Sequence, residues 1–212
     1  MCDLDIKEKC EFITTSLGMP EPLFLNGEDA NIADHRVNVK NRAVSYGLSD
    51  ACDYYATDIS ASSRGTTFTV HTPKGETETL TAALIGRHNV INILGAVAIA
   101  CELGISLAAL KPQVRRLESV PHRLQLIRQT GLTVIDDAYN SNPAGAKNAL
   151  ETLALCRGTR IVITPGLVEL GHRELEYNEE LGRQAADSCQ WLITVGRQDR
   201  TEAIRKGTED AK

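Results

Sequence analysis

Two adjacent aspartates, Asp136 and Asp137, stand where a strand-forming run ends and a helix is expected to begin. The segment 132–143 reads LTVIDDAYNSNP, and its first residues have the aliphatic and branched side chains that strands favour. Asn142 is a strong helix N-cap, and Pro143 suits the first helical position because its missing N–H would have no partner there. We therefore expect a buried strand that delivers two carboxylates, a tyrosine and two asparagines to the gap before a helix N-terminus.

The position of these side chains favours a ligand site, although another explanation accounts for the same residues. In parallel α/β folds, ligands bind at the carboxyl ends of strands, and a helix start favours a nearby anion. A solvated turn between strand and helix would use the same residue types, because Asp and Asn are common in turns. This segment alone does not distinguish a ligand site from a solvated turn, so the choice depends on the other motifs.

A second polar cluster interrupts an otherwise apolar helix that is predicted to run from Gly86 to about Leu103. His88 and Asn92 are four residues apart and Asn89 and Asn92 are three apart, so the three side chains share one helix face. Amide side chains donate and accept hydrogen bonds at once, which suits the edge of a purine. Simple capping of the helix by Asn89 is the alternative.

Two further motifs lie in loops. Arg123, in the sequence PHRLQ at 121–125, has a planar guanidinium suited to phosphate or carboxylate, or else is an exposed linker residue. The sequence TPGLVELG at 164–171 has glycines that allow close backbone approach, and it would place Glu169 at the same rim as Asp137. A structural loop explains the second motif as well.

Composition excludes several classes of function. The 212 residues are 42% hydrophobic and carry a net charge of −5, so no basic field indicates binding to nucleic acid or to an anionic membrane. Six scattered cysteines without a CxxC pair favour free thiols over zinc or disulfides. No apolar run reaches about 18 residues and no signal peptide is recognisable, so we expect a cytoplasmic protein without membrane insertion.

The pattern of elements predicts two lobes, residues 1–119 and residues 120–212, with the boundary at Val120-Pro121. The first lobe is expected to hold strands at 23–25, 42–48 and 53–60 and a hairpin of 66–72 with 77–85. Ser106 is predicted to cap a helix that Pro112 should distort or restart. The second lobe alternates strands with helices: strands at 132–136, 160–164 and 191–195, and helices at 143–156, about 173–189 and in the tail.

This alternation implies a parallel sheet with right-handed crossovers. The predicted fold class is therefore α/β, with a mixed sheet, a hairpin and helices in the first lobe and a Rossmann-like second lobe. The motifs occur in the order LNGED (25–29), GRHNVINILGA (86–96), PHRLQ, VIDDAYNSNP (134–143) and TPGLVELG. Together they resemble the Mur ligase family, from about Lys9 to Gly196. Each motif is weak alone, but five in this order are specific.

Within the family, DDAYNSNP and VELG are most similar to the branch that adds D-alanyl-D-alanine to UDP-N-acetylmuramoyl-tripeptide. The resemblance implies an ATP-dependent amide ligase that works through an acyl phosphate, with the central domain of the family in the first lobe. ATP is expected between the lobes, with adenine at Asn89 and Asn92 and with His88 beside them. The resemblance places Arg123 near the phosphates as a catalytic residue and Asp137 at the ribose. It places Tyr139, Asn140 and Asn142 on the side of the amine substrate.

Lys9 is a separate hypothesis. The stretch KCEFI at 9–13, followed by LFLNGED, resembles the segment that carries the carbamylated lysine of the family. Carbamylation would turn an ammonium into a carboxylate able to bind Mg²⁺, which prefers oxygen ligands. The alternative is an exposed helix lysine next to Lys7.

Departures from the family pattern also matter. No GxxGK[ST] phosphate loop occurs in the sequence, and the amino-terminal UDP-binding domain of the family is not represented. We therefore expect a monomeric fragment, the back portion of the central domain plus most of the carboxyl-terminal domain, that does not catalyse by itself. The alternatives are another Mur-type ligase, a folylpolyglutamate synthetase-like ligase or a non-catalytic nucleotide-binding module. An oxidoreductase is disfavoured, because no GxGxxG follows the strand at 132–136.

Overall fold

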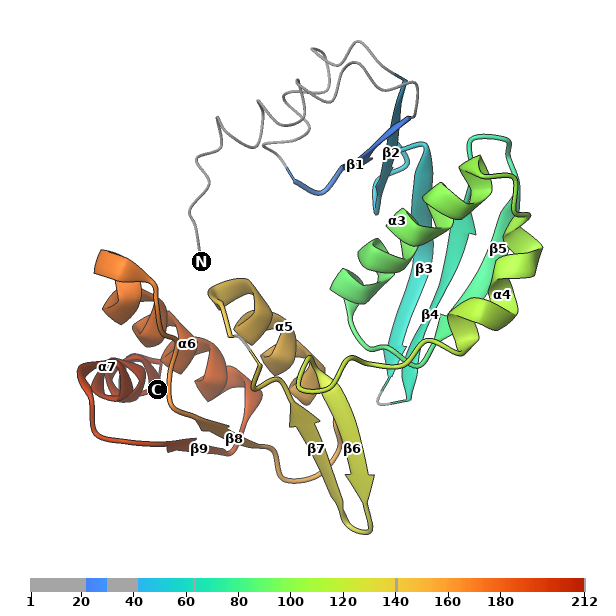
Figure 1. Cartoon of the computed structure of the whole chain (residues 1–212). Helices are drawn as coiled ribbons and strands as arrows, with labels where there is room; N and C mark the ends of the chain where they lie inside the picture. Colours follow the sequence, from blue (N-terminus) through green and yellow to red (C-terminus); the bar gives the residue numbers. More distant parts are fainter. Residues whose placement is uncertain (1–21, 30–41, 63, 140, 212) are drawn as a thin grey trace. The chain divides into compact units, whose positions relative to one another are not determined.

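The computed structural model describes residues 22–29, 42–62, 64–139 and 141–211. Contacts between Cα atoms divide the chain into two compact units. The first ends at Leu117 and the second starts at Glu118, with residues 61–64 and 84–86 assigned to the second. Each unit has its own sheet strands and helices (Figure 1).

The first unit contains a mixed five-stranded sheet whose strands lie in chain order. They are β1 (Leu23–Asn26), β2 (Ala43–Gly47), β3 (Tyr54–Ser62), β4 (Gly65–His71) and β5 (Thr77–Ala82). The first three strands are parallel, whereas β4 and β5 form the antiparallel hairpin that the sequence predicts. Phe68 lies opposite Leu80, and both are fully buried, as the alternating pattern of the two strands requires.

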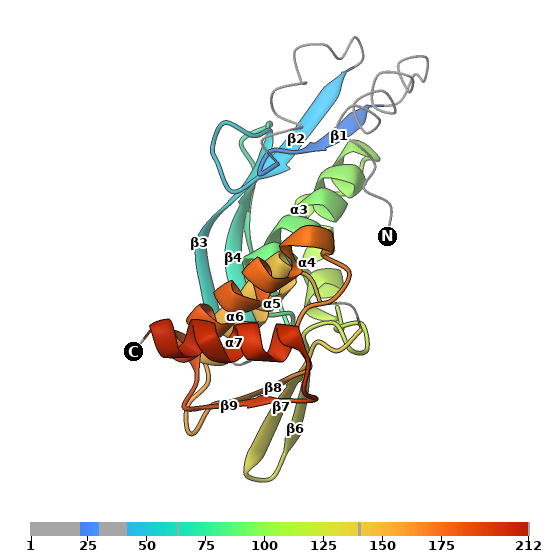
Figure 2. The same ribbon diagram turned by 90° about the vertical axis from the view of Figure 1, so that its left-hand side faces the viewer.

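Two helices, α3 (Arg87–Glu102) and α4 (Leu107–Arg115), cover one face of this sheet (Figures 1 and 2). Helix α3 contacts β1, β2 and β4, while α4 contacts β5. Gly95 allows α3 to lie close to the sheet, because a Cβ at this position would be 3.0 Å from a ring carbon of Tyr46. The buried face of α3 supplies Val90, Ile93, Leu94, Val97 and Ala98 to the core.

The end of α3 follows the sequence prediction. Gly104 has φ +89 and its N–H donates to the carbonyl of Cys101, while the N–H of Ile105 donates to that of Ala100. This pair of bonds is the Schellman motif, which needs a residue with positive φ at the position of Gly104. Ser106 is the N-cap residue of α4, but its side chain makes no capping bond.

The sequence predicts that Pro112 distorts the helix or makes it restart. Helix α4 instead runs through Pro112 without a restart. Pro112 is exposed, so its ring packs against no neighbouring element of the core. In a helix of nine residues the missing N–H removes one intrahelical bond, which the packing of Leu107 and Val114 offsets.

The second unit contains two small sheets and three α-helices. Strands β6 (Gln125–Gln129) and β7 (Leu132–Asp136) are antiparallel, and β8 (Ile161–Thr164) and β9 (Trp191–Thr194) are parallel. The helices are α5 (Pro143–Ala154), α6 (Glu174–Ser188) and α7 (Asp199–Asp210), with a short 3-10 turn η3 (Gly171–Arg173) before α6. The predicted α/β class, with a mixed sheet in one lobe and a parallel sheet in the other, is confirmed.

The expectation that 132–136 forms a buried strand is wrong. Leu132 and Val134 are 56% and 40% exposed, because β7 is one half of a two-stranded hairpin and not an interior strand of a parallel sheet. Its partner β6 was not predicted. The turn between the strands has Gly131 at φ +77, a conformation that glycine adopts readily.

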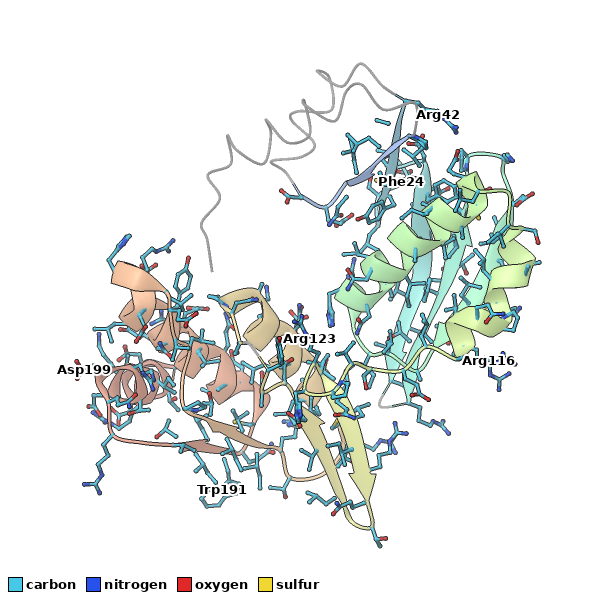
Figure 3. All side chains as sticks on the ribbon, viewed as in Figure 1. Phe24, Arg42, Arg116, Arg123, Trp191 and Asp199 are labelled. Carbon is cyan, nitrogen blue, oxygen red and sulfur yellow. The ribbon has the colours of Figure 1, made fainter. Side chains whose placement is uncertain are left out.

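The helices of the second unit lie on one face of the β8–β9 pair, where six side chains form the core: Ala146, Leu150, Leu167, Leu181, Ala185 and Ile204. The opposite face exposes a set of large apolar side chains, Ile161, Ile163, Trp191, Ile193 and Val195. Figure 3 shows Trp191 on the side of β9 away from the helices. Apolar side chains on both faces are typical of parallel strands, which are usually covered on both sides.

No helix within the described ranges is long and apolar enough to cross a membrane. The four cysteines that the structure describes, Cys52, Cys101, Cys156 and Cys189, are free thiols, as expected.

Candidate functional site

The two aspartates at the end of β7 hold the segment that precedes β6. Asp136 accepts from the backbone N–H of Ala138 at 3.2 Å, and its other oxygen lies 2.8 Å from Nδ1 of His122. Asp137 accepts the backbone N–H of Leu124 at 3.0 Å. The hydrogen bond from His122, and then that from Ala138, lowers the pKa of the Asp136 carboxyl below its ordinary value. Asp136 thus contacts the residue before Arg123, and Asp137 contacts the residue after it.

Arg123 contacts an aromatic ring of the same site. Its guanidinium carbon is 4.6 Å from the ring centroid of Tyr139, a side chain that is 66% exposed. The backbone N–H of Tyr139 donates to the carbonyl of His122 at 3.1 Å, which holds the ring and the arginine segment together. The guanidinium of Arg123 therefore stacks on an aromatic face, and both side chains are exposed at the surface of the second unit.

The start of α5 has the predicted cap. Asn142 is the N-cap residue, its side-chain oxygen accepts the N–H of Gly145 at 2.8 Å, and Pro143 is the first helical residue. This capping bond fixes the side chain of Asn142 at the helix start, close in sequence to Tyr139. Asn140 lies outside the described residues.

The helix cluster in the first unit also has the predicted local geometry. His88, Asn89 and Asn92 lie in the first two turns of α3, His88 and Asn89 half-buried and Asn92 exposed. On a regular helix the spacings of three and four residues put these side chains on one face. These three residues belong to the first unit and Arg123 to the second, so one site that uses all of them stays a prediction.

The loop after β8 is organised by a residue that the sequence analysis missed. Asn178 in α6 is fully buried; its side chain accepts the N–H of Leu167 at 2.8 Å and donates to the carbonyls of Leu167 and Glu174. Glu169 in this loop is exposed and has φ +61. The signal that could have revealed this role is an asparagine inside a predicted helix, because such a side chain often bonds to nearby backbone groups.

The predicted metal site is not represented among these residues. Lys9 lies outside the described part of the chain, and within that part no group of three or more His, Cys, Asp or Glu side chains could hold a metal ion. Within each unit the residue types suit part of a nucleotide. The amides of the first unit suit a base, and in the second unit a carboxylate suits sugar hydroxyls and a guanidinium suits phosphate.

Comparison with known proteins gives the family. Residues 5–100 match the Mur ligase middle domain, and residues 122–212 match the Mur ligase glutamate ligase domain. The chain belongs to the Mur ligase family. It is 33% identical over 157 residues to the UDP-N-acetylmuramoyl-tripeptide–D-alanyl-D-alanine ligase of Escherichia coli, which is 73% of this chain and 34% of that protein. The chain thus spans about a third of the length of the curated relatives it matches.

Other Mur ligases are similar as well. The UDP-N-acetylmuramate–L-alanine ligase of Syntrophobacter fumaroxidans is 33% identical over 129 residues, 61% of this chain and 28% of that protein. Among solved structures, the Acinetobacter baumannii ligase that is named for joining D-alanyl-D-alanine to a 2,6-diaminopimelate-containing precursor has a TM-score of 0.82 and 27% identity. The match covers 96% of this chain and 44% of that one. The MurF ligase of Thermotoga maritima in complex with ADP shares the fold, with a TM-score of 0.80 at 20% identity over 94% of this chain and 45% of that one.

Proposed function

We propose that this chain is part of an ATP-dependent amide ligase that joins D-alanyl-D-alanine to UDP-N-acetylmuramoyl-tripeptide in peptidoglycan precursor synthesis. The observation that carries the proposal is the arrangement at the end of β7, where Asp136 and Asp137 hold the segment that presents Arg123 on Tyr139. The relatives named for D-alanyl-D-alanine transfer support the choice of amine substrate.

The reaction has two steps. A carboxylate oxygen of the peptide attacks the γ-phosphorus of ATP, which forms an acyl phosphate and releases ADP. The amine nitrogen of D-alanyl-D-alanine then attacks the acyl carbon, the phosphate leaves, and the nitrogen loses a proton. Charge builds up on the transferred phosphoryl oxygens, and a nearby cation stabilises that charge.

The residues of the chain divide these tasks by chemistry. The guanidinium of Arg123 binds phosphate oxygens, and the carboxylate of Asp137 accepts from the ribose hydroxyls. A carboxylate has about four acceptor positions, so the bond from the N–H of Leu124 is compatible with this role. His88, Asn89 and Asn92 hold the adenine edge, whereas Tyr139, Asn140 and Asn142 face the amine substrate. Lys9, if carbamylated, would supply carboxylate oxygens to hold Mg²⁺.

The test is an amine-specificity assay on the ligase that contains this chain. Phosphate release from ATP is measured with UDP-N-acetylmuramoyl-tripeptide and one of several amines: D-alanyl-D-alanine, L-alanine, D-glutamate or 2,6-diaminopimelate. We expect turnover with the dipeptide to exceed that with each single amino acid by at least about 100-fold, since a site built for two residues loses binding energy when one is missing. A parallel assay replaces the tripeptide precursor with UDP-N-acetylmuramate. Turnover there with L-alanine, and none with D-alanyl-D-alanine and the tripeptide precursor, would instead indicate the activity for which the Syntrophobacter fumaroxidans relative is named.

A non-catalytic nucleotide-binding module is the second candidate, favoured by the sequence without a GxxGK[ST] loop. Binding of ATP without phosphate release under any of these amine conditions would support it. We expect the 212-residue chain alone to release no phosphate, because the phosphate-binding loop that this chemistry needs is not among its residues.

A further inference from the structure

Arg123 lies between two residues with an unusual backbone conformation. His122 has φ +62 and Leu124 has φ +51, the left-handed region that residues with a Cβ seldom adopt. This conformation is unfavourable for a residue with a Cβ and persists only where the surrounding structure determines it. One such residue stands on each side of Arg123. The backbone N–H of Arg123 itself donates to the carbonyl of Val120 at 3.1 Å, so the position of Arg123 is set by this turn together with contacts from outside the segment.

Those contacts come from the two aspartates. Asp136 contacts the ring of His122 at 2.8 Å, and Asp137 accepts the N–H of Leu124 at 3.0 Å. The register of the hairpin places Gln125 opposite Asp136, so the strand end and the arginine segment lie side by side. The carbonyl of His122 also accepts the N–H of Tyr139 at 3.1 Å. The segment is thus fixed on both sides of Arg123.

The aspartates contact the neighbours of Arg123, and the guanidinium contacts Tyr139. An aspartate bonded to the guanidinium would occupy the N–H groups that bind phosphate, whereas stacking uses the face of the cation. Asp136 is only 19% exposed, while the ring of His122 is 60% exposed, so the carboxylate is the better-ordered partner. The hydrogen bond from His122 favours the ionised form of this carboxylate and lowers the pKa of Asp136.

We propose that Asp136 and His122 are a positioning pair, which fixes the backbone at Arg123 and so presents its guanidinium on Tyr139 for a phosphate group. The inference rests on the proposed function for the identity of the phosphate, a nucleotide. The positioning of Arg123 by Asp136 and His122 is independent of the proposed function. In this role the pair acts on the phosphate through Arg123.

The positioning is measured first on the 212-residue chain by NMR. In the wild type, the ring current of Tyr139 shifts the side-chain resonances of Arg123, and Tyr139→Leu defines the position without the ring. We expect Asp136→Ala and His122→Gly to move the Arg123 resonances to the Tyr139→Leu position. Glycine tolerates the positive φ at position 122, so the second variant removes the ring without adding strain. His172→Ala, which removes an exposed histidine elsewhere in the unit, is the matched control and leaves the resonances unchanged.

The consequence for function is measured in the ligase that contains the chain. His122→Gly and Asp136→Ala each raise KM for ATP about 3- to 10-fold and leave KM for the peptide substrate unchanged. Asp136→Asn, which keeps an acceptor for His122, raises KM for ATP less than Asp136→Ala does. Unfolding midpoints of the variants show whether a change is merely structural.

Arg123 resonances that stay shifted in both Asp136→Ala and His122→Gly overturn the positioning pair, whatever happens to ATP binding. Resonances that move while Arg123→Ala leaves KM for ATP unchanged overturn the assignment of Arg123 to the nucleotide. That outcome counts against the proposed site and leaves the geometry of the pair intact.

Discussion

Gly182 in α6 lies against the backbone of Ile204 in α7, so closely that a Cβ on Gly182 would be 2.1 Å from the carbonyl oxygen of Ile204. The contact is reciprocal, because a Cβ on Gly207 would be 1.9 Å from the carbonyl oxygen of Glu179. Both clashes are with backbone, which cannot move aside as a flexible side chain can. We therefore expect Gly182→Ala to lower the free energy of unfolding of the second unit by about 3 kcal/mol, measured by urea denaturation.

Gly145→Ala is the matched control for this prediction. A Cβ on Gly145 would meet only the side chain of Asn142, at an ordinary 3.5 Å, and the residue sits in the first turn of α5. Alanine in a helix is favoured over glycine by about 0.5–1 kcal/mol, so this variant should be neutral or slightly more stable. Equal urea midpoints for the Gly182→Ala and Gly145→Ala variants would contradict the close packing of α6 and α7.

Asn178 should contribute as much to the free energy of unfolding as an apolar core residue does. Asn178→Ala removes the acceptor for the buried N–H of Leu167 and two donors to backbone carbonyls. An unsatisfied buried polar group costs about 1–3 kcal/mol, so we expect a loss near the upper end of that range. Hydrogen exchange at Leu167 should accelerate with it. Protection at Leu167 equal to that in wild type would show that another group satisfies this N–H.

Sequence reasoning found the elements that local patterns determine. Alternation and a turn predicted the β4–β5 hairpin, and the types of Asn142 and Pro143 predicted the start of α5; both are set by neighbours in sequence. It missed β6, because Leu126 and Ile127 are flanked by polar residues, and it misjudged the burial of β7, because exposure depends on the neighbouring strand.

The chemistry of the site could be predicted from residue types, but its contacts could not. The sequence marks Arg123, Asp137 and Tyr139 as polar and aromatic residues near a strand end. It does not show that the arginine stacks on the tyrosine, or that His122 and Leu124 adopt positive φ, because both follow from the pairing of β6 with β7. Contacts of this kind depend on residues about 13 to 16 positions apart, beyond the reach of local patterns.

The exposed apolar face of β8–β9 should limit the solubility of the 212-residue chain. Ile163 and Ile193 are 67% and 48% exposed and lie opposite each other in register. Replacing both with threonine keeps a β-branched residue in each strand and removes apolar surface, so solubility should rise with little change in the urea midpoint. Light scattering against concentration measures the first quantity. A large loss of stability in the double variant would mean that these side chains are covered in solution.

Asp136 should make the stability of the second unit depend on pH in the acid range. Its pKa in the folded chain is lowered, so its contribution is present above the ordinary aspartate range and is lost as the pH falls through the lowered value. We expect the urea midpoint of the wild type to fall more steeply than that of Asp136→Asn below about pH 4. Other carboxyls with lowered pKa values, such as Glu179 and Glu180, remain in both proteins, so the difference between the two curves isolates Asp136.

Substitutions of Asp137 test the proposed nucleotide site directly. Asp137 also holds the backbone of Leu124, so the effect of a substitution on structure has to be separated from its effect on ATP binding. Asp137→Ala removes the acceptor for the N–H of Leu124, whereas Asp137→Asn retains an oxygen for that bond and removes the charge. A hydrogen bond to a charged group is worth about 1.5–3 kcal/mol, so Asp137→Ala in the ligase that contains this chain should raise KM for ATP by about 10- to 100-fold. If the carboxylate binds ribose hydroxyls, Asp137→Asn should also raise KM for ATP, by a smaller factor, while its unfolding midpoint stays near wild type. ATP kinetics unchanged in both variants would show that the carboxylate of Asp137 does not bind the ribose, and the ribose assignment would be wrong.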